Sequence, residues 1–440
     1  MFSRKASFLH HALALFLLAV LSAPALAHQR HRRQALEHSV NDSSAAAARL
    51  SARDRQEIFS ETWVTINEKY YDPSFNGVNW RAVREQYRPA VEAARSDEDF
   101  YTVMKKMVGE LRDAHTRFAT PRERMEREQL KAITAGVSID EVEGKPVVVT
   151  VEPNSEAARQ GIEVGMLVVA IGGKPVAEKI AEAQARVGGT STQRAVKLRV
   201  YRQLVEGEPG TPLRLTLQRA DGSHLEVSLT RRFVRDVAHV ISRRLPSGIG
   251  YIRLTLWKSP AHKEFKRALE ALRDAPGIII DLRGNPGGEA QEVVKIASLF
   301  FNTRVSFGKF VWRSGKSFDL YTDRDDQVYQ GPVVILVNEA SGSGSELFSA
   351  SMQENGRAAV MGRQSCGCVL GISNYKKLKG GSELAVSELK YISPQGHLIE
   401  GAGVVPNHPV PLTLADLQHH RDATLEAAEA ALQKTGASMR

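Results

Sequence analysis

The sequence predicts a multidomain chain that combines α/β and α+β folds: an N-terminal helical bundle, a small α+β module and an α/β core with a largely parallel sheet. Three observations predict it. Apolar residues first recur at helical spacing, short β-branched runs between turn signals follow, and strands then alternate with helices. With 42% hydrophobic and 25% charged residues, the 440-residue chain has globular composition. Two to four domains are expected at roughly 150 residues each.

Residues 1–27 predict a secretory signal peptide. A positively charged start precedes an apolar stretch over 12–21, and Ala25 and Ala27 form a small-x-small cleavage pattern. The apolar stretch is about half as long as a membrane span needs, and a retained signal anchor is the alternative. We therefore expect an exported protein, periplasmic or secreted, that is cleaved near Ala27. Residues 28–46 lack hydrophobic periodicity and predict a flexible lead.

The formal net charge of +9 is compatible with a nucleic-acid partner, a membrane surface or simple solubility. Cleavage of the leader removes Arg4 and Lys5 and no acid, so +9 becomes +7. Export argues against nucleic acid as the natural partner, and no later apolar stretch of about eighteen residues predicts a stable membrane span. Because neither HExxH nor paired CxxC motifs are present, no metal or other cofactor is expected.

Residues 47–131 form the predicted N-terminal helical region. Ile58, Trp63 and Ile66 recur at spacings near 3.6, and turn signals in 71–77 end that helix. Two further helical sets are Trp80, Val83, Tyr87 and Val91, and then Phe100, Val103, Met107 and Leu111. The region contains the segment Asp113-Ala114-His115-Thr116.

The α+β module is expected over residues 132–232 and the α/β core over 233–412. A C-terminal helix and tail are expected over 413–440. The strands expected in the module are 147–151, 166–171, 213–217 and 225–229, with a helix over 177–187. The core is expected to have strands at 251–256, 277–282 and 333–338, another that begins at 359–361, and helices at 261–273, 289–301 and 345–355. The C-terminal helix, over 413–435, is polar and is expected to be peripheral.

A serine-rich turn follows one buried strand of the predicted core. Val333–Val337 leads into Ser341-Gly342-Ser343-Gly344-Ser345, and a helix begins near Glu346. A serine at a strand-to-helix turn can expose its hydroxyl, and the helix N-terminus favours nearby negative charge. The functional interpretation is a nucleophile, Ser343, beside part of an oxyanion hole. The alternative is an ordinary helix start with Ser345 as the N-cap.

A second glycine-rich turn ends another buried strand, where residues 278–288 read IIIDLRGNPGG. In a parallel sheet both turns lie at the carboxyl ends of strands, where ligands bind. Gly287 and Gly288 could aim bare backbone N–H groups at a developing oxyanion. A dinucleotide-binding loop is the competing interpretation, but GxGxxG is not present.

Together the two turns resemble those of the C-terminal-processing (tail-specific) serine peptidase family, including its tricorn-like branch. The resemblance extends over most of the mature chain and includes the segments 111–116, 250–254 and 393–406. It implies a ClpP/crotonase-like core and a serine endopeptidase that hydrolyses polypeptides near their C-terminus through an acyl-enzyme. It also implies that Ser343, the middle serine of SxSxSE, is the nucleophile. The implied oxyanion donors are Gly344 and either Gly287 or Gly288.

The α+β module resembles a PDZ domain over residues 148–176. A PDZ domain binds a C-terminal peptide by strand addition, and backbone amides hold the peptide carboxylate. The resemblance places that peptide-binding loop at Ala135, Gly136, Val137 and Ser138. Met166 departs from the pattern, because an acidic residue usually stands there.

The general base departs from the pattern of the processing peptidases. Their lysine, 25 residues after the nucleophile, would fall on Cys368. The tricorn-like branch uses a histidine instead, and Asp113-Ala114-His115-Thr116 fits that form. With an unperturbed pKa of about 6.5, histidine accepts a proton at neutral pH. The resemblance therefore implies His115 as base and Glu400 as the group that orients it, with Asp113 as the second choice for that group. A capping or loop histidine is the alternative for His115.

Cys366 and Cys368 are the only two cysteines. A neutral thiol, with a pKa of about 8.5, is a poor general base. The pair could form a CxC disulfide after export, lie as small buried hydrophobes, or modulate activity by redox.

Three functions are compatible with these observations. The first is the exported serine endopeptidase acting on polypeptide substrates. The second is a catalytically inactive peptide-binding adaptor or chaperone on the same scaffold, because Cys368 replaces the lysine. The third is a carrier of hydrophobic ligands. The joint presence of Ser343, His115 and Glu400 favours the first, and the sequence favours no particular oligomeric state.

Overall fold

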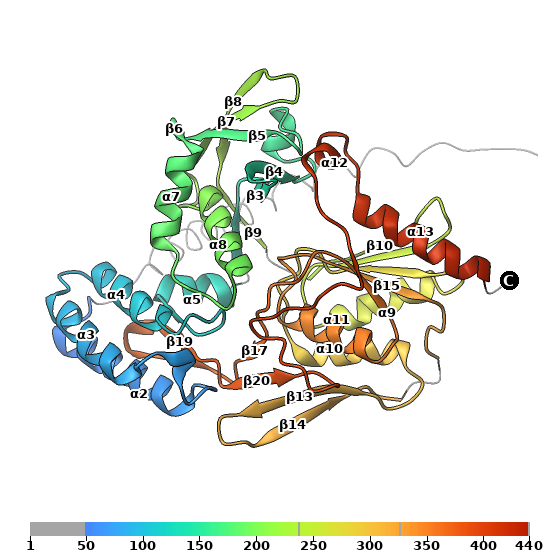
Figure 1. Ribbon diagram of the computed structural model, residues 1–440. Helices are drawn as coiled ribbons and strands as arrows, with labels where there is room; N and C mark the ends of the chain where they lie inside the picture. Colours follow the sequence, from blue (N-terminus) through green and yellow to red (C-terminus); the bar gives the residue numbers. More distant parts are fainter. Residues whose placement is uncertain (1–48, 130, 236–237, 325–326, 439–440) are drawn as a thin grey trace, which may run out of the picture. The chain divides into compact units, whose positions relative to one another are not determined.

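The computed structural model describes residues 49–129, 131–235, 238–324 and 327–438. The predicted signal peptide (1–27) and flexible lead (28–46) lie outside the described residues. From Ala52 onward the chain forms one structural unit, whose helices and strands are shown in Figure 1. Within the described part of the chain, no helix combines the length and the apolar character that crossing a bilayer requires.

The N-terminal region is helical, as the sequence predicts. Its long helices are α2 (Ala52–Lys69), α3 (Trp80–Ala93) and α4 (Asp97–Gly109). The indole N–H groups of Trp63 and Trp80 each donate to the other residue's backbone carbonyl, at 2.9 and 3.2 Å, and so join α2 to α3. The three helices bury Ile58, Ile66, Val83, Phe100 and Met104 between them. This burial stabilises the bundle more than helix propensity does.

A short strand after α4 ties this region to the C-terminal half of the chain. β1 (Arg117–Ala119) pairs antiparallel with β19 (Glu383–Ala385), which also pairs with β18 (Tyr375–Lys377). Arg127, from α5 (Pro121–Glu128), donates to both carboxylate oxygens of the buried Glu383, at 3.1 and 2.7 Å. The loop that carries His115 is therefore held at its far end by residues distant in sequence.

The middle of the chain forms an antiparallel sheet with helices packed on it. The strands, in spatial order, are β3 (Val137–Val142), β4 (Lys145–Val151), β5 (Leu167–Ile171), β7 (Pro212–Gln218) and β8 (His224–Thr230), and β6 (Lys174–Pro175) pairs with β5. The helices are α6 (Glu156–Arg159), α7 (Val176–Arg186) and α8 (Gln193–Val205), and α8 packs against β3. β2 (Lys131–Thr134) and β9 (Arg232–Arg235) pair as a ribbon at the two ends of this segment.

The third part is built on a six-stranded sheet that is parallel except at one edge. Its strands, in spatial order, are β10 (Val240–Arg244), β11 (Gly250–Leu254), β12 (Ile278–Asp281), β15 (Val333–Val337), β16 (Ala359–Gly362) and β21 (His408–Pro409), and only β10 runs antiparallel. Side chains alternate between its faces. Ile278 and Ile280 pack with residues of α9 (Ala261–Ala271), α10 (Ala290–Ala297) and α11 (Gly344–Glu354), whereas Ile279 packs toward the C-terminal helix. A second sheet contains β14 (Ser317–Tyr321), β13 (Ser306–Trp312), β20 (Leu389–Ile392) and β17 (Leu370–Gly371).

The C-terminal segment differs from the single peripheral helix expected over 413–435. It forms α12 (Leu414–Gln418) and α13 (Ala423–Ser438), and α13 covers one face of the parallel sheet. Its contact side chains include Ala428 and Leu432, which are 0% and 3% exposed. Because only two of its four apolar contact positions, Leu425 and Leu432, are large, the hydrophobic pattern is too weak to indicate burial.

The packing of α13 predicts a large effect of a single truncation. Leu432→Ala should lower the free energy of unfolding by about 2–5 kcal/mol, because it leaves a cavity against the sheet. The exposed neighbour Gln433→Ala is the matched control and should change it by no more than ~0.5 kcal/mol. Urea unfolding of the three proteins measures both, and equal stabilities would show that α13 does not pack on the sheet.

Candidate active site

Ser343 lies between the carboxyl end of β15 and the first residue of α11. Its backbone has φ 48° and ψ −111°, a conformation that residues other than glycine rarely adopt. The N–H of Ser343 donates to the carbonyl oxygen of Cys368 at 2.9 Å and to the carboxylate of Glu346 at 3.0 Å, and these bonds hold the strained backbone. The residue is partly exposed, whereas the glycines on either side are buried. Held strain of this kind is concentrated at functional sites.

The other two serines of the turn attach it to the core. The hydroxyl of Ser341 donates to the carbonyl oxygen of Leu282 at 2.8 Å. The hydroxyl of Ser345 donates to the carbonyl oxygen of Asn285 at 3.0 Å and accepts the indole N–H of Trp257 at 2.9 Å. Both serines are fully buried. The outer serines therefore have structural partners, and the middle one is the serine that reaches the surface.

The glycine-rich turn after β12 packs directly against Ser343. At Gly287, where φ is +109°, a Cβ atom would lie 2.5 Å from the Cβ of Ser343. At Gly288, where φ is +139°, a Cβ atom would lie 2.1 Å from the carbonyl oxygen of Trp257. A side chain at Gly287 would force the two turns apart, and one at Gly288 would collide with the backbone of Trp257. The structure thus brings the two predicted turns into contact.

Two backbone donors next to Ser343 are free. The N–H of Gly287 donates to Oδ1 of Asn285 at 2.9 Å. By contrast, the N–H groups of Gly288 and Gly344 donate to no atom of the described residues. They are close together, since the nitrogen of Gly288 lies 3.3 Å from the place a Cβ on Gly344 would occupy. Of the three predicted oxyanion donors, Gly288 and Gly344 are therefore the two with an N–H available to a ligand.

One buried carboxylate organises the loop on the other side of Ser343. Glu346 is completely buried and accepts hydrogen bonds from the backbone N–H groups of Ser343, Gly367 and Cys368 and from the hydroxyl of Ser365. Burial raises the pKa of Glu346, and the hydrogen bonds oppose that rise. Glu346 was not predicted as a site residue, although an acid three residues into a helix is a known sequence signal for capping.

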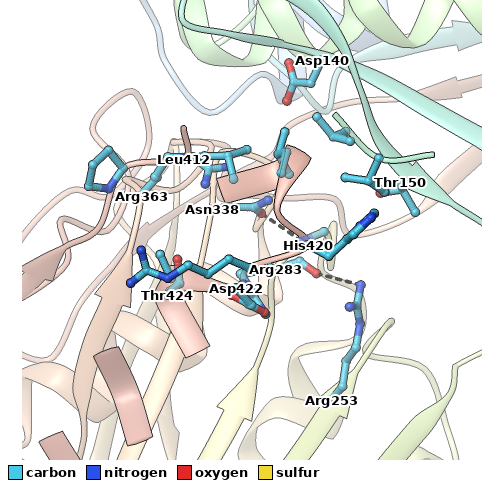
Figure 2. Close-up of a pocket in the computed structure, with 17 residues that line it drawn as sticks. Asp140, Thr150, Arg253, Arg283, Asn338, Arg363, Leu412, His420, Asp422 and Thr424 are labelled. Atoms are coloured by element: carbon cyan, nitrogen blue, oxygen red, sulfur yellow. Dashed lines mark hydrogen bonds and ion pairs between the residues drawn. The ribbon is translucent and has the colours of Figure 1, made fainter. Parts of the chain in front are cut away.

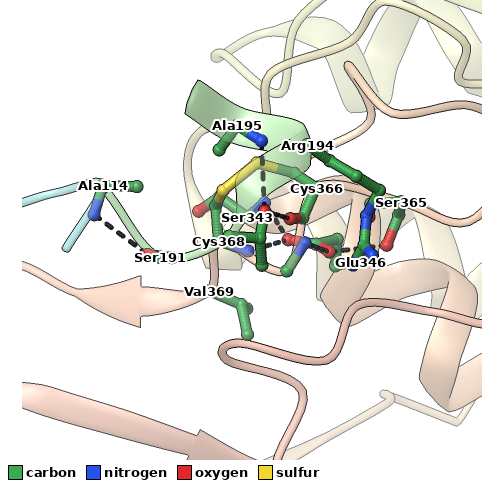
Figure 3. The surroundings of a disulfide bond; sticks show 12 residues. Ala114, Ser191, Arg194, Ala195, Ser343, Glu346, Ser365, Cys366, Cys368 and Val369 are labelled. Carbon is green, nitrogen blue, oxygen red and sulfur yellow. Dashed lines mark hydrogen bonds between the residues drawn. A yellow bond between two sulfur atoms is a disulfide. The ribbon is translucent and has the colours of Figure 1, made fainter. Parts of the chain in front are cut away.

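The position of the expected lysine is occupied by a disulfide. Cys366 and Cys368 are bonded to each other beside Ser343 (Figure 3), which is one of the alternatives left open by the sequence. The disulfide packs against Ala195 at the start of α8. Thr192 also donates from its hydroxyl to the carbonyl oxygen of Cys366 at 2.7 Å. The side chain at 368 is therefore committed to a covalent bond and to packing.

His115 lies in the loop between α4 and β1. The carboxylate of Asp113 accepts the backbone N–H groups of His115 and Thr116, at 2.7 and 2.6 Å, and the hydroxyl of Ser387 at 2.9 Å. Nδ1 of His115 is buried and has no hydrogen-bond partner among the described residues. Burial lowers the pKa of His115 to about 4; Asp113 opposes this shift, and the charges of Arg117 and Arg199 add to it. The imidazole is therefore neutral at pH 7.

Glu400 lies close to the same loop. Its carboxylate accepts the N–H of Val369 at 2.6 Å and is hydrogen-bonded to the side chain of Ser191. The hydroxyl of Ser191 also accepts the N–H of Ala114 at 3.0 Å, so it links Glu400 to the residue before His115. Burial raises the pKa of Glu400 to about 7. No pattern around Ser191 in the sequence indicates this bridging position.

The structure brings the predicted oxyanion glycines to Ser343, but in the described part of the chain it does not join the predicted nucleophile, base and orienting acid by hydrogen bonds. Ser343, Gly287 and Gly344 meet directly, whereas among the described residues the ring of His115 makes no hydrogen bond with Ser343 or Glu400. Within the same residues, no group of three or more His, Cys, Asp or Glu side chains could hold a metal ion.

The predicted peptide-binding loop, 135–138, lies at the start of β3. The N–H of Gly136 donates to the hydroxyl of Thr134 at 2.9 Å, and a Cβ on Gly136 would lie 2.9 Å from that of Ser155. Further along β3, Glu141 accepts hydrogen bonds from Lys197 and Tyr201 of α8, at 2.9 and 3.2 Å. These two bonds bridge the strand and the helix beside it.

A cavity of about 440 Å³ borders the turn that precedes Gly287 (Figure 2). Arg283 contributes to its wall, and its guanidinium donates to Asp281 at 2.7 Å and to Asp422 at 2.7 and 2.8 Å. Asn338 accepts the N–H of Gly284 at 2.9 Å on the same wall. Because these groups are already paired, we assign the cavity a structural role in fixing the turn.

Comparisons with known sequences decide the family. The profile described as Peptidase family S41 matches residues 248–410, and the profile of the Tricorn protease C1 domain matches residues 51–109. The chain is 28% identical to the carboxyl-terminal-processing protease of Synechocystis sp., over 86% of this chain and 87% of that one. It is 30% identical to carboxyl-terminal-processing peptidase 2, chloroplastic, of Arabidopsis thaliana, over 80% and 68% of the two chains. The chain belongs to peptidase family S41.

The solved structure of the photosystem II D1 C-terminal processing protease has the same fold. It matches with a TM-score of 0.57 and 24% identity, over 81% of this chain and 93% of that one. Membership of family S41 makes the chain a serine-type peptidase, a hydrolase that acts on polypeptides. The alternative of a non-catalytic adaptor gains no support, because the relatives from Synechocystis sp. and Arabidopsis thaliana are both processing peptidases.

The raised pKa of Glu400 predicts a pH-dependent stability. Its value rises from 4.5 to about 7 in the folded protein, so its ionised form is disfavoured by folding. The resulting stabilisation is complete below about pH 4.5 and is lost as the pH rises through about 7, by ~3 kcal/mol in all. Glu400→Gln cannot ionise and should lose correspondingly less stability between pH 5 and pH 8.

Urea unfolding at the two pH values measures this difference. Glu226→Gln, which removes an exposed glutamate, is the matched control and should keep the wild-type dependence. If Glu400→Gln lost as much stability as the wild type, Glu400 would not be the group responsible.

Proposed function

We propose that the chain is an exported serine endopeptidase of the carboxyl-terminal-processing type, which cuts polypeptides through an acyl-enzyme on Ser343. The observation that carries the proposal is the strained, partly exposed Ser343 beside the free N–H groups of Gly288 and Gly344. Such an arrangement suits acyl transfer, because the developing negative charge finds fixed donors without any reorganisation. Residues 1–27 would direct export and be removed.

In the proposed first step, Oγ of Ser343 attacks the carbonyl carbon of a peptide bond and loses its proton to His115. The N–H groups of Gly344 and Gly288 hold the oxyanion of the tetrahedral intermediate. Gly287 lets the two turns approach closely, because no Cβ stands between them. The positive end of the α11 dipole favours the same charge.

His115 is the proposed base because it is neutral at pH 7 and because the position of the family lysine holds Cys368 in a disulfide. Its unpaired Nδ1 shows that the ring has unused hydrogen-bonding capacity. Binding of a polypeptide would bring the ring into hydrogen-bond contact with Ser343, as catalytic hydrogen bonds often tighten only in the complex. Ionised Glu400, linked to the His115 loop through Ser191, would stabilise the imidazolium.

The second half of the reaction reverses these roles. The imidazolium of His115 gives its proton to the leaving amine, and the C–N bond breaks to leave an ester on Ser343. Water then attacks the ester carbonyl carbon and gives a proton to His115. The ester C–O bond breaks, the imidazolium returns the proton to Oγ of Ser343, and the acyl part leaves as a carboxylic acid. The PDZ-like module, with its loop at 135–138, would bind the C-terminal segment of the substrate by strand addition.

Two substitutions test the assignment of nucleophile and base. Ser343→Ala and His115→Ala should each reduce cleavage of an unfolded protein substrate by about 10³-fold or more, because neither step of acyl transfer proceeds without them. Circular dichroism should show the wild-type fold in both. A fluorophosphonate probe should label the wild type at Ser343 and should fail to label Ser343→Ala.

Each result bears on a separate part of the proposal. Full activity in His115→Ala would remove His115 as base while leaving Ser343 in place. Labelling of Ser343→Ala at the wild-type rate would remove Ser343 as nucleophile.

The pKa values of the site predict the acid side of the pH profile. The plot of kcat/KM should fall as the pH decreases through about 7, because protonation of Glu400 removes the charge that stabilises the imidazolium. In Glu400→Gln, which should be slower than the wild type above about pH 7 and similar to it well below, that fall should vanish and only the protonation of His115 near pH 4 should remain. An unchanged acid limb in the variant would assign it to another group.

A further inference from the structure

A second cavity, of about 770 Å³, lies beside the loop of His115 and has no role in the chemistry described above. Its walls come from the end of α4, the loop that follows it, α5, the α7–α8 connection and one side of α8. Because it includes residues 112–114 and 116–119, it begins at the loop that holds His115. We call it the basic groove, for the charges that line it.

Basic side chains predominate in the groove. They are Lys105, Lys106, Arg112, Arg117, Arg127, Arg186 and Arg199, against the acidic Glu110, Asp113 and Glu123. The acidic groups are already engaged: Glu123 with Lys105 at 2.6 Å, Glu110 with the hydroxyl of Tyr87 at 2.7 Å, and Asp113 with its own loop. Seven basic side chains against three acidic ones leave the lining of the groove with an excess of positive charge.

Four of the cations have no carboxylate partner. Lys106, Arg112, Arg117 and Arg199 form no ion pair with any described residue. Arg199 donates only to the carbonyl oxygen of Ala114, at 3.1 Å, and Arg117 lies over the ring of Tyr375. Unpaired cations that line one concave surface concentrate a positive potential in it.

This potential reaches the proposed base. The charges of Arg117 and Arg199 help to lower the pKa of His115, so both guanidinium groups act electrostatically on its ring. An anion bound between them would offset that effect and favour the protonated form that His115 adopts after the first proton transfer. Occupancy of the groove and proton transfer at His115 are thus physically coupled.

We propose that the basic groove binds acidic segments of polypeptide substrates, so that chains with Asp and Glu near the cleavage site are cut preferentially. The inference rests on the proposed function and adds a substrate class to it. The location of the groove favours a polypeptide as the bound anion. The groove begins at the loop that carries His115, so a substrate that crosses the site can extend into it. The net charge of +7 that is left after removal of residues 1–27 would favour the approach of such substrates over longer distances.

Two synthetic peptides with one cleavage sequence test the inference. One carries Glu in its flanks, and the other carries Gln at the same places. In 50 mM NaCl the wild type should cut the Glu peptide with a kcat/KM about tenfold higher, mainly through KM, and the ratio should fall to about twofold in 500 mM NaCl because exposed charges are screened. A ratio near one at low salt would overturn the inference.

A double variant locates the preference. Lys106 and Arg112 are both exposed, so Lys106→Gln combined with Arg112→Gln should fold normally, and it should lower the ratio of the two peptides to about twofold or less in 50 mM NaCl. Lys263→Gln, which removes an exposed cation of α9 outside the groove, is the control and should keep the wild-type ratio. Loss of the preference in the control, or its retention in the double variant, would contradict the assignment.

Binding without cleavage separates this inference from the proposed function. Ser343→Ala should bind a fluorescent Glu peptide about tenfold more tightly than the Gln peptide in 50 mM NaCl, and the double groove substitution should abolish the difference. If such binding is found in a protein that does not cut peptides, the groove is right and the proposed chemistry is wrong. If the wild type cuts peptides but Ser343→Ala binds both peptides equally well, the proposed chemistry is right and the groove assignment is wrong.

A competition experiment tests for nucleic acid as the ligand. Displacement of the Glu peptide by a single-stranded DNA oligonucleotide at lower concentration than by unlabelled Glu peptide would reassign the groove to nucleic acid.

Discussion

The close contact between two turns, at which no side chain can be accommodated, is the constraint on which the candidate site depends. A Cβ on Gly287 would lie 2.5 Å from that of Ser343, and a Cβ on Gly288 would overlap the carbonyl oxygen of Trp257. The contact holds the turn after β12 against the start of α11, and both turns leave parallel neighbouring strands. It also exposes backbone N–H groups where a side chain would otherwise stand. The same contact thus determines both the placement of the nucleophile, Ser343, and the placement of the backbone N–H donors beside it.

Glu346 extends that constraint to a third segment. Its carboxylate binds the N–H of Ser343 and the N–H groups of the 367–368 loop, so the strained conformation of Ser343 is held from two sides. A fully buried carboxylate is stable only when its hydrogen-bonding capacity is satisfied, and the neighbouring hydroxyl of Ser365 completes the set. The cost of burying Glu346 is therefore offset by bonds that fix the loop carrying the disulfide.

Local patterns make part of this arrangement predictable from the sequence. A buried strand followed by glycine or serine and then a helix is a short-range signal, and the residues of each turn are sufficient to indicate it. The helical start of the chain is predictable for the same reason, since its apolar residues recur at a regular spacing. Ser191 is not predictable, because its role arises from contacts with Ala114 and Glu400, which are distant in sequence. The burial of α13 escapes prediction because alanine contributes little to a hydrophobic pattern, and the sequence permits either a disulfide or free thiols at 366 and 368.

The loop at 366–368 acts mainly through its backbone, and this explains how the family lysine can be absent. The carbonyl oxygen of Cys368 accepts the N–H of Ser343, and its own N–H donates to Glu346, whatever the side chain is. Replacement of the lysine therefore keeps the positioning of the nucleophile and removes only the proton acceptor. In the proposed mechanism a half-buried, neutral His115 fills that place, but the desolvation that keeps it neutral also makes its imidazolium costly. Desolvation also raises the pKa of Glu400 to about 7, so its charge is available only near and above neutral pH, which makes Glu400 the group that limits how readily His115 accepts a proton.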